Sequence, residues 1–306
     1  MEKIKIGTDC SGIEAPIQAI QQLKIPFKHV FSSEIDQFCI KSIKANYDPE
    51  IIFGDRDGDF PEGDIRKRKI SSVPDIDLYV CGFPCQPFST AGYREGFKDE
   101  RGNVFETCYE IIKHKKPSYF ILENVKGLLS HDKGETWKIV LKKLKSLKLY
   151  NVYWKILNTR DYGIPQNRER LFIVGVKKPL KFSWPKKMKM KPLTAFIDED
   201  NKIEYITTKR QQKILDNLED GLFIDFAFGT AIERSFINAG SYCSCITANS
   251  RIWCVPQRRY ATCEELLALQ GFKNFEQVVS NTQLKKQIGN SMSVNVLKEI
   301  IKNLLN

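Results

Sequence analysis

The sequence lacks the apolar segments that would place a protein in or across a membrane. It has no run of about 18 uncharged apolar residues, which is the length that a membrane-spanning helix needs. Its first residues, MEKIKIGTDCSG, contain no apolar stretch of the kind found in a signal peptide. We therefore expect a protein that has no membrane partner, is not secreted and stays in the cytoplasm.

The sequence also lacks the cysteine and histidine spacings of disulfide frameworks and zinc sites. Its nine cysteines are scattered and form no Cys-x-x-Cys pair, and it has only three histidines. An odd number of scattered cysteines favours reduced thiols over disulfides. Four cysteines near the end of the chain match no common zinc pattern and lie far from the histidines: Cys243, Cys245, Cys254 and Cys263. We expect no bound metal.

Acidic residues are too few to balance the basic ones. The chain has 48 Lys and Arg against 37 Asp and Glu, which gives a net charge of +11. Residues 177–191 (KKPLKFSWPKKMKMK) contain seven lysines and no acid, with Phe182 and Trp184 among them. A basic run is most often a solvated surface, but aromatic residues within it favour a polyanion, and nucleic acid is the leading partner class.

With 306 residues, 42% of them hydrophobic and 28% charged, the chain is long enough for one large core and a smaller second lobe. Its first half alternates short β-rich runs with runs of helical periodicity. The expected strands are 3–8, 27–32, 78–83, 119–125, 152–157 and 170–176, and the expected helices are 15–23, 36–47, 104–115 and 136–147. This alternation predicts an α/β fold with a doubly wound, Rossmann-like sheet and helices on both faces.

Residues 178–257 break the alternation, because Lys, Pro, Gly, Asn and aromatic residues follow one another there without a sustained period. We interpret this stretch as a smaller, irregular domain. Helical patterns return at 263–272 and 293–306, and the second of these is amphipathic and expected to pack on the first domain.

The segment CGFPCQPFSTAG, residues 81–92, places Cys85 between Pro84 and Gln86, just after an expected strand. Ligands of doubly wound sheets bind outside the carboxyl ends of strands, so a thiol there is placed for nucleophilic chemistry. A buried, inert cysteine is the alternative interpretation of this residue taken alone. Glu123 lies at the end of another expected strand, YFILENV, where a carboxylate must be paired, protonated or functional.

Further polar residues accompany the other expected strands. The segment YGIPQNRERLFIVGV places Gln166, Arg168 and Arg170 around the start of a strand, where the arginines can bind phosphate, a base oxygen or a carboxylate. The turn TDCSGIEA after the first strand, with Glu34 after the second, has the layout that holds a nucleoside by its ribose hydroxyls. Because this turn is not G-x-G-x-x-G, a nicotinamide cofactor is disfavoured.

Taken in order, these segments resemble the motifs of the cytosine carbon-5 DNA methyltransferase family, and the bacterial and viral restriction-modification type is closest in size. GFPCQPFS resembles the family's nucleophile loop, ENV its glutamate motif and QNRER its arginine motif. Further motifs occur in the expected order at 63–65, 101–105, 259–272 and 289–296. The resemblance covers nearly the whole chain except the irregular domain.

The resemblance implies S-adenosylmethionine as methyl donor and double-stranded DNA as partner. It makes 1–177 the catalytic and S-adenosylmethionine-binding domain, 178–257 the target-recognition domain that reads the major groove, and 258–306 a return segment that completes the catalytic domain. The implied cofactor-binding residues are Cys10, Ser11, Gly12, Ile13, Glu34, Ile35, Asp64, Ile65, Pro84, Val104, Asn290 and Ser291. The implied substrate-binding residues are Gln86, Ser89, Gln166 and Arg259.

The catalytic residues that the resemblance implies are Cys85, Glu123, Arg168 and Arg170. In this chemistry the Cys85 thiolate adds to carbon 6 of a flipped cytosine, and carbon 5 becomes nucleophilic enough to take a methyl group. Glu123 assists at ring nitrogen 3, while the two arginines hold the base oxygen and support the thiolate and the carboxylate.

The sequence departs from the family pattern at the first turn, with Cys10 in place of an aromatic residue and Glu14 in place of a common glycine. Two other interpretations stay open: a transfer-RNA cytosine-5 methyltransferase, which shares the motifs, and a catalytically inactive DNA-binding relative. The length of the irregular domain favours duplex DNA, and the retained Cys85, Glu123 and Arg168 favour activity. We expect a monomer in a bacterium or a virus-infected cell, with a cognate restriction endonuclease as a functional partner only.

Overall fold

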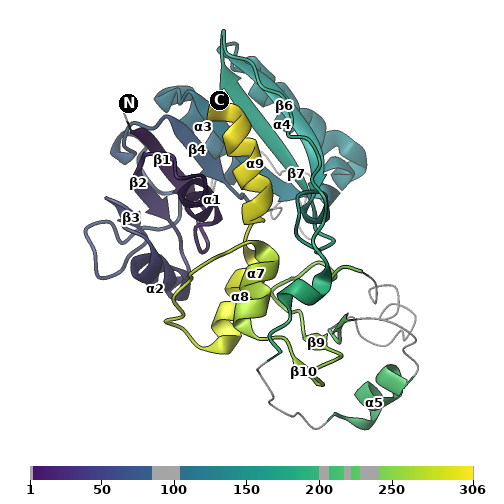
Figure 1. Ribbon diagram of the computed structural model, residues 1–306. Coiled ribbons are helices and arrows are strands. Elements are labelled where there is room, and N and C mark those ends of the chain that lie inside the picture. Colours follow the sequence, from purple (N-terminus) through teal and green to yellow (C-terminus); the bar gives the residue numbers. More distant parts are fainter. Residues whose placement is uncertain (1–2, 85–103, 200–206, 217–221, 228–240, 306) are drawn as a thin grey trace. The chain divides into compact units, whose positions relative to one another are not determined.

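The computed structural model describes residues 3–84, 104–199, 207–216, 222–227 and 241–305 (Figure 1). By packing, the chain forms two compact units. The first comprises residues 1–157, 169–185 and 297–306, and the second comprises 158–168 and 186–296. Which residues make up the cofactor-binding and target-recognition domains stays a prediction.

A seven-stranded sheet organises the first unit, with the strand order β3-β2-β1-β4-β5-β7-β6. Its strands are β1 Ile4–Asp9, β2 Phe27–Ser33, β3 Ile52–Phe53, β4 Leu78–Cys81, β5 Tyr119–Val125, β6 Tyr150–Asn158 and β7 Glu169–Lys177. The first five strands pair in parallel, and β7 runs antiparallel to β5. The carboxyl ends of β1, β2, β4 and β5 therefore meet at one edge of the sheet, which is where doubly wound folds bind ligands.

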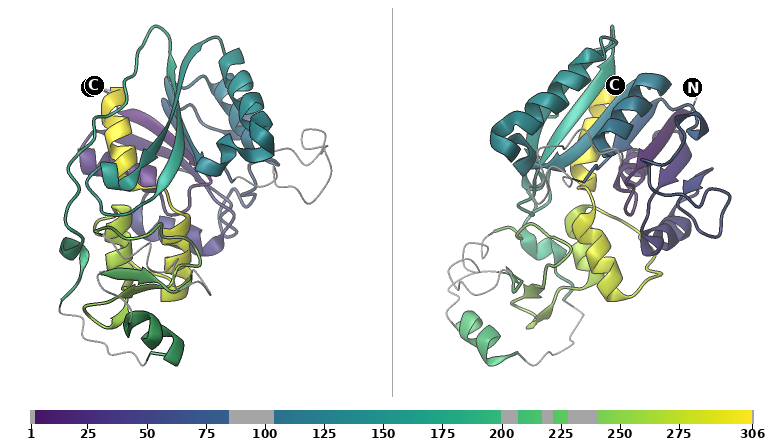
Figure 2. Two further views of the ribbon diagram at one scale, coloured as in Figure 1. Left: turned by 90° about the vertical axis from the view of Figure 1, so that its right-hand side faces the viewer. Right: turned by 180° about the vertical axis from the view of Figure 1, so that it is seen from behind.

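Helices cover both faces of this sheet. They are α1 Ala15–Leu23, α2 Gln37–Asn46, α3 Val104–Lys115, α4 Glu135–Ser146 and α9 Val294–Leu305. Helices α3 and α4 lie over one face, and α1 and α9 lie over the other (Figures 1 and 2). Because side chains alternate along a strand, Phe120 and Leu122 of β5 both face the α3 and α4 side, where they join Phe105 and Val140 in one buried cluster.

Local sequence explains where the first helices begin. The turn from β1 to α1 contains three residues in the left-handed region, Cys10, Gly12 and Glu14, and Pro16 lies in the first turn of α1. Proline is well tolerated at a helix start because its missing N–H would have no partner there. Helix α2 begins after Asp36, whose carboxylate accepts a hydrogen bond of 2.9 Å from the backbone N–H of Phe38.

The second unit contains a small antiparallel sheet and three α-helices among its described residues. Its strands are β8 Phe223–Asp225, β9 Ile252–Cys254 and β10 Arg259–Tyr260, in the order β10-β9-β8. Its helices are α5 Lys209–Asp216, α7 Cys263–Gln270 and α8 Asn281–Asn290. Helix α7 starts with a capping box, in which Thr262 and Glu265 each bond the other's backbone N–H, and ends at the left-handed Gly271.

Short 3-10 turns occur at η1 Ile70–Ser72, η2 Lys126–Leu129, η3 His131–Gly134, η4 Thr159–Asp161 and η5 Leu193–Phe196. Among the described residues, we find no helix with the length and apolarity that a membrane crossing requires. The prediction of a doubly wound α/β sheet with helices on both faces is confirmed. The strand β3, the helices α5 and α8 and the small sheet are elements that the periodicity did not predict.

Candidate active site

Strands β4 and β5 end side by side, and a side chain ties the two ends together. Asn124, in β5, donates a hydrogen bond of 2.9 Å from Nδ2 to the backbone oxygen of Phe83, just beyond β4. The exposed Pro84 follows Phe83 and ends the described stretch. Three predicted site residues, Cys85, Gln86 and Ser89, lie outside the described residues. The chain is therefore anchored beside the end of β5 two residues before Cys85.

Glu123 and Arg170 form an ion pair at this end of β5. The antiparallel ladder pairs Glu123 with Phe172 and Val125 with Arg170, so the two charged residues are close neighbours on adjacent strands. Arg170 Nε lies 3.2 Å from Glu123 Oε1, and the side chains are only 16% and 11% exposed. Because burial removes the solvation of both charges, each one depends on its partner. The structure thus brings together two of the predicted catalytic residues.

The first turn faces Glu34 at the ends of β1 and β2. The Gly12 N–H donates a hydrogen bond of 2.9 Å to Glu34 Oε2, while the backbone N–H groups of Ile35 and Asp36 donate to Oε1. Burial raises the pKa of the Glu34 carboxyl, although these three hydrogen bonds oppose the shift. A Cβ placed on Gly12 would have no heavy atom within 4 Å, and the Ile35 side chain is 68% exposed. An open glycine turn, a carboxylate and an exposed apolar side chain suit a nucleoside.

Two glycines let three backbone segments meet beside Glu34. A Cβ on Gly54 would lie 1.9 Å from the backbone oxygen of Glu34, and a Cβ on Gly63 would lie 2.3 Å from the same atom. Only glycine permits such close approach. This contact places Asp64 next to the end of β2. The Asp64 carboxylate is bound by Arg66 at 2.6 Å, and hydrogen bonding to Arg66 lowers the pKa of Asp64.

Several predicted cofactor residues turn their side chains into the protein. Ile13 and Ile65 are buried in the apolar core, and Val104 packs against it at the start of α3. Ser11 is also buried, and the half-buried Cys10 packs against the core. Any contact that the two isoleucines make with a ligand would therefore involve their backbone atoms.

A buried ion pair beneath this edge was not predicted from the sequence. Arg68 NH2 donates to Asp9 Oδ2 at 2.8 Å, and the Tyr79 hydroxyl donates to the same oxygen at 2.7 Å. The Arg68 guanidinium lies 4.4 Å from the centre of the Phe53 ring. In the sequence, Arg68 looks like any solvated basic residue, because it lies in a polar run after β3. The one available signal is Asp9, since a carboxylate that is buried at the end of a strand needs a partner.

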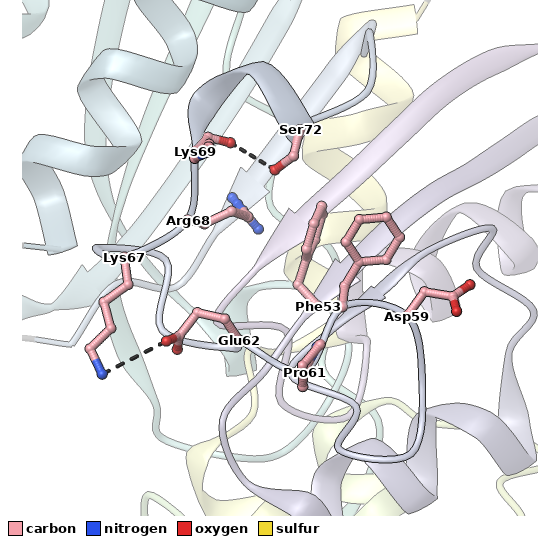
Figure 3. A pocket seen from close by; sticks show the side chains of 9 residues that line it. Phe53, Asp59, Pro61, Glu62, Lys67, Arg68, Lys69 and Ser72 are labelled. Atoms are coloured by element: carbon pink, nitrogen blue, oxygen red, sulfur yellow. Dashed lines mark hydrogen bonds and ion pairs between the residues drawn. The ribbon is translucent and has the colours of Figure 1, made fainter.

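Arg68 and Phe53 also line a cavity of about 250 Å³ (Figure 3). Phe60 and Pro61 supply apolar walls, and Lys67 reaches across to Glu62 with an N–O distance of 3.7 Å. None of the lining residues belongs to the predicted cofactor set.

In the second unit, Arg168 binds backbone carbonyls. Its guanidinium donates to the oxygens of Ile246 and Ser291, both at 2.6 Å, and to that of Gly289 at 3.2 Å. Gln166 is likewise buried and donates to the backbone oxygen of Leu269 at 2.8 Å. These contacts connect the arginine motif to the GNS segment within this unit.

The remaining predicted residues also lie in the second unit. Arg259 is buried and forms a bidentate ion pair with Glu265 at 2.8 and 2.9 Å, a hydrogen-bonded pairing that raises the pKa of Arg259. Asn290 is exposed at the end of α8, whereas the Ser291 hydroxyl is buried and donates to the backbone oxygen of Met292. The described part of the chain shows no group of three or more His, Cys, Asp or Glu that is arranged for a metal ion.

Comparisons with known proteins identify similar chains. The sequence profile of the family described as C-5 cytosine-specific DNA methylase matches residues 4–223 and 231–306. Type II methyltransferase M.NgoBI of Neisseria gonorrhoeae is 38% identical over 276 residues, covering 88% of this chain and 84% of the relative. M.HaeII of Haemophilus aegyptius is 36% identical over 285 residues, covering 91% and 86%. In fold, the chain resembles a mutant of Spodoptera frugiperda DNMT2 with a TM-score of 0.72 and 17% identity, over 99% of this chain and 100% of the other.

Proposed function

Because this chain belongs to the C-5 cytosine-specific DNA methylase family, we propose that Cys85, Glu123 and Arg170 methylate carbon 5 of a cytosine within a specific duplex DNA sequence. The family resemblance and the enzyme class predicted from the sequence are confirmed. The observation that carries the residue assignment is the Glu123–Arg170 pair at the end of β5, beside the anchored backbone of Phe83.

The chemistry assigns a distinct task to each of these side chains. The Cys85 thiolate adds to carbon 6 of the cytosine, so that electron density moves to carbon 5. Glu123 hydrogen-bonds at ring nitrogen 3, where charge changes as the sulfur adds, and Arg170 fixes the direction of that carboxyl through its 3.2 Å contact. After the methyl group is on carbon 5, a base removes the carbon 5 proton and the thiolate leaves.

Arg168 has a supporting part in this proposal. Its guanidinium is already used by three backbone carbonyls of the second unit, two of which belong to the Gly289–Ser291 segment. We assign it to holding that segment in place, and Gln166 supports the same region from its buried position. This refines the expectation that both arginines hold the base oxygen.

The methyl donor in this proposal is S-adenosylmethionine, which supplies an electrophilic methyl group when bound. Glu34 would accept the ribose hydroxyls, Ile35 would pack on the adenine, and the open backbone at Gly12 would lie against the nucleoside. Asp64 and Ile65 would contact the adenine, and Asn290 and Ser291 the methionine end. The fit rests on the open space over Gly12 and on the half-buried carboxylate of Glu34 beside it.

DNA binding is proposed for residues 178–257 as the target-recognition domain, with the basic run 177–191 on the phosphates. The target cytosine must leave the stack, because its carbon 6 cannot be reached by a thiolate within a duplex. We further propose that the enzyme is a cytoplasmic monomer that marks self-DNA against a cognate restriction endonuclease.

The experiment combines tritiated S-adenosylmethionine with duplex DNA, transfer RNA and three proteins: the wild type, Cys85→Ser and Cys39→Ser. The last variant is a matched control, because Cys39 is a buried cysteine on α2 that forms no disulfide and has no part in the proposal. We expect the wild type and Cys39→Ser to label DNA and Cys85→Ser to transfer nothing. Sequencing of the methylated DNA then gives the recognition sequence.

Two results would contradict the proposal. Labelling of transfer RNA and not of DNA would identify an RNA methyltransferase with the same chemistry. Tight DNA binding without any transfer by the wild type would identify an inactive relative, whereas the retained Cys85, Glu123 and Arg168 favour activity.

A further inference from the structure

Glu14 has an unusual position for a carboxylate. It precedes α1 with φ 59° and ψ 48°, in the left-handed region that residues other than glycine rarely adopt. Its side chain is completely buried, although a buried charge is costly unless hydrogen bonds satisfy it. A position that is strained in backbone and costly in burial requires a compensating interaction.

The compensation comes from two hydroxyl groups on neighbouring strands. The Thr8 hydroxyl of β1 donates to Glu14 Oε1 at 2.5 Å, and the Ser32 hydroxyl of β2 donates to the same oxygen at 2.6 Å. His29 Nε2, also on β2, lies 3.0 Å from the Ser32 hydroxyl and 3.6 Å from Glu14 Oε1. One carboxylate oxygen thus joins the carboxyl-terminal halves of β1 and β2.

From Thr8 the hydrogen bonds continue into the glycine turn. Since the Thr8 proton points to Glu14, the Thr8 oxygen accepts from the Ser11 hydroxyl at 2.7 Å. The Ser11 oxygen in turn accepts the Ser33 N–H at 3.0 Å, and the Ser11 N–H donates to the Ser33 backbone oxygen at 3.1 Å. The Ser11 hydroxyl also lies 3.1 Å from the Thr8 backbone oxygen, which is a second acceptor for its single proton. Because the Thr8 hydroxyl gives its own proton to Glu14, that hydroxyl can only accept from Ser11.

The row ends at the two groups that face the nucleoside site. Gly12 follows Ser11, and Glu34 follows Ser33. Their direct contact, Gly12 N–H to Glu34 Oε2 at 2.9 Å, is therefore held on both sides by the Ser11–Ser33 bonds. Without the acceptor at Glu14, the buried Thr8 and Ser32 hydroxyls would need other hydrogen-bond acceptors. For Thr8, the nearby Ser11 hydroxyl oxygen is such an acceptor.

We propose that Glu14 is a positioning residue for the methyl donor: its Oε1 atom orders the Thr8 and Ser11 hydroxyls and thereby fixes Gly12 against Glu34. Glu14 itself touches no ligand in this arrangement. The inference rests on the proposed function, because it needs the Gly12–Glu34 turn to be the cofactor site.

The proposal predicts a specific pattern among three substitutions. Glu14→Gln keeps an acceptor oxygen at the same place and should bind S-adenosylhomocysteine within about threefold of the wild type. Glu14→Ala and Glu14→Gly remove the acceptor, and the dissociation constant should rise about tenfold, which corresponds to about 1.4 kcal/mol. Glu14→Gly also relieves the left-handed strain, so its affinity should fall without a matching loss of stability.

The measurement is calorimetric titration of each protein with S-adenosylhomocysteine, combined with urea unfolding and steady-state kinetics. Tyr150→Phe is the control, because it removes another buried hydrogen bond, 2.8 Å to the Pro117 oxygen, at the amino end of the sheet. This control should lose stability and keep its affinity. In the kinetics, KM for the methyl donor should rise in Glu14→Ala and Glu14→Gly, while KM for DNA and kcat stay near the wild-type values.

The outcomes separate this inference from the proposed function. If the wild type binds no S-adenosylhomocysteine, the proposed function is wrong. If it binds, but Glu14→Gly binds equally well or Glu14→Gln is as weak as Glu14→Ala, the positioning role is overturned and the proposed function stands. A rise in KM for DNA equal to that for the methyl donor would also overturn it, because general loosening of the fold affects both.

Discussion

At the scale of single residues, the surroundings of Glu34 decide what its carboxylate can do. Burial raises its pKa, and three backbone N–H groups hold it in one orientation. The group therefore keeps its proton at pH values where an exposed glutamate has lost it. An ionised carboxylate accepts two ribose hydroxyls better than a protonated one, so the state of this group should control cofactor affinity.

We predict that the affinity for S-adenosylhomocysteine rises with pH through a midpoint above 4.5, the ordinary pKa of glutamate. The folding stability should change in the opposite sense. Because the folded pKa is the higher one, the folded state binds more protons in the window above the ordinary value, and the contribution of Glu34 to stability falls as pH rises through that window.

Titrations at a series of pH values, with Glu34→Gln as the control, test this prediction. The variant should bind more weakly at neutral pH, and this dependence on pH should be absent from its affinity. An unchanged midpoint in the variant would assign the dependence to another group.

Some residues of the site could be read from the sequence and others could not. Glu34 and Gly12 were predicted because each follows a recognisable strand, and the structure places them in contact. Glu14 was noted only as a departure from the family pattern, since its partners Thr8 and Ser32 belong to two strands whose register the sequence does not reveal. The Asp9–Arg68 pair joins residues that are 59 positions apart, a contact that local pattern cannot indicate.

At the scale of elements, sequence periodicity predicts long helices and strands better than short ones. Helix α3 and strand β5 have the predicted bounds, because twelve and seven residues are enough to display a period. Strand β3 and the strands of the small sheet have only two or three residues each and carry no period. Helix α8, NTQLKKQIGN, has only two large apolar residues, Leu284 and Ile288, and both are buried. Its sequence pattern therefore resembles that of a polar loop.

Gly63 lies in the loop after β3, where the backbone packs closely against Glu34 at the end of β2. In Gly63→Ala the new Cβ would lie 2.3 Å from the Glu34 backbone oxygen and 2.8 Å from the Gly54 Cα, both of them backbone atoms that cannot rotate away. We expect a loss of about 1–3 kcal/mol in the free energy of unfolding, as overpacked sites show. Affinity for S-adenosylhomocysteine should fall as well, because the shifted atom belongs to Glu34.

Urea unfolding checks this prediction, with Gly127→Ala as the matched control. The nearest atom to a Cβ at Gly127 is Val125 Cγ2 at 3.9 Å, an ordinary contact, so the control should stay within about 0.5 kcal/mol of the wild type. Equal stabilities for the two variants would mean that the loop moves away freely and that the glycine is not required for this approach.

At the scale of the whole molecule, the positive charge is unevenly distributed along the chain. Residues 177–191 contain seven of the 48 basic residues and no acid. Lys186, Lys187 and Lys189 are exposed, and Lys187 also pairs with Asp161 at 2.9 Å while its side chain stays 75% exposed. Exposed ammonium groups suit a phosphate chain, which attracts point charges regardless of base sequence.

We therefore predict that replacing Lys186, Lys187 and Lys189 by glutamine weakens DNA binding by a similar factor for specific and unrelated duplexes. Each phosphate contact that is lost should reduce the slope of log K against log salt concentration by about 0.9, so three lost contacts make the dependence shallower by nearly 3.

The matched control replaces Lys142, Lys145 and Lys148, which are also exposed and change the net charge by the same amount. If the control flattens the salt dependence as much as the test variant does, net charge alone attracts DNA; if neither does, the run 177–191 lies away from the phosphates. A change confined to the test variant would place this run on the DNA backbone and leave base recognition to the rest of residues 178–257.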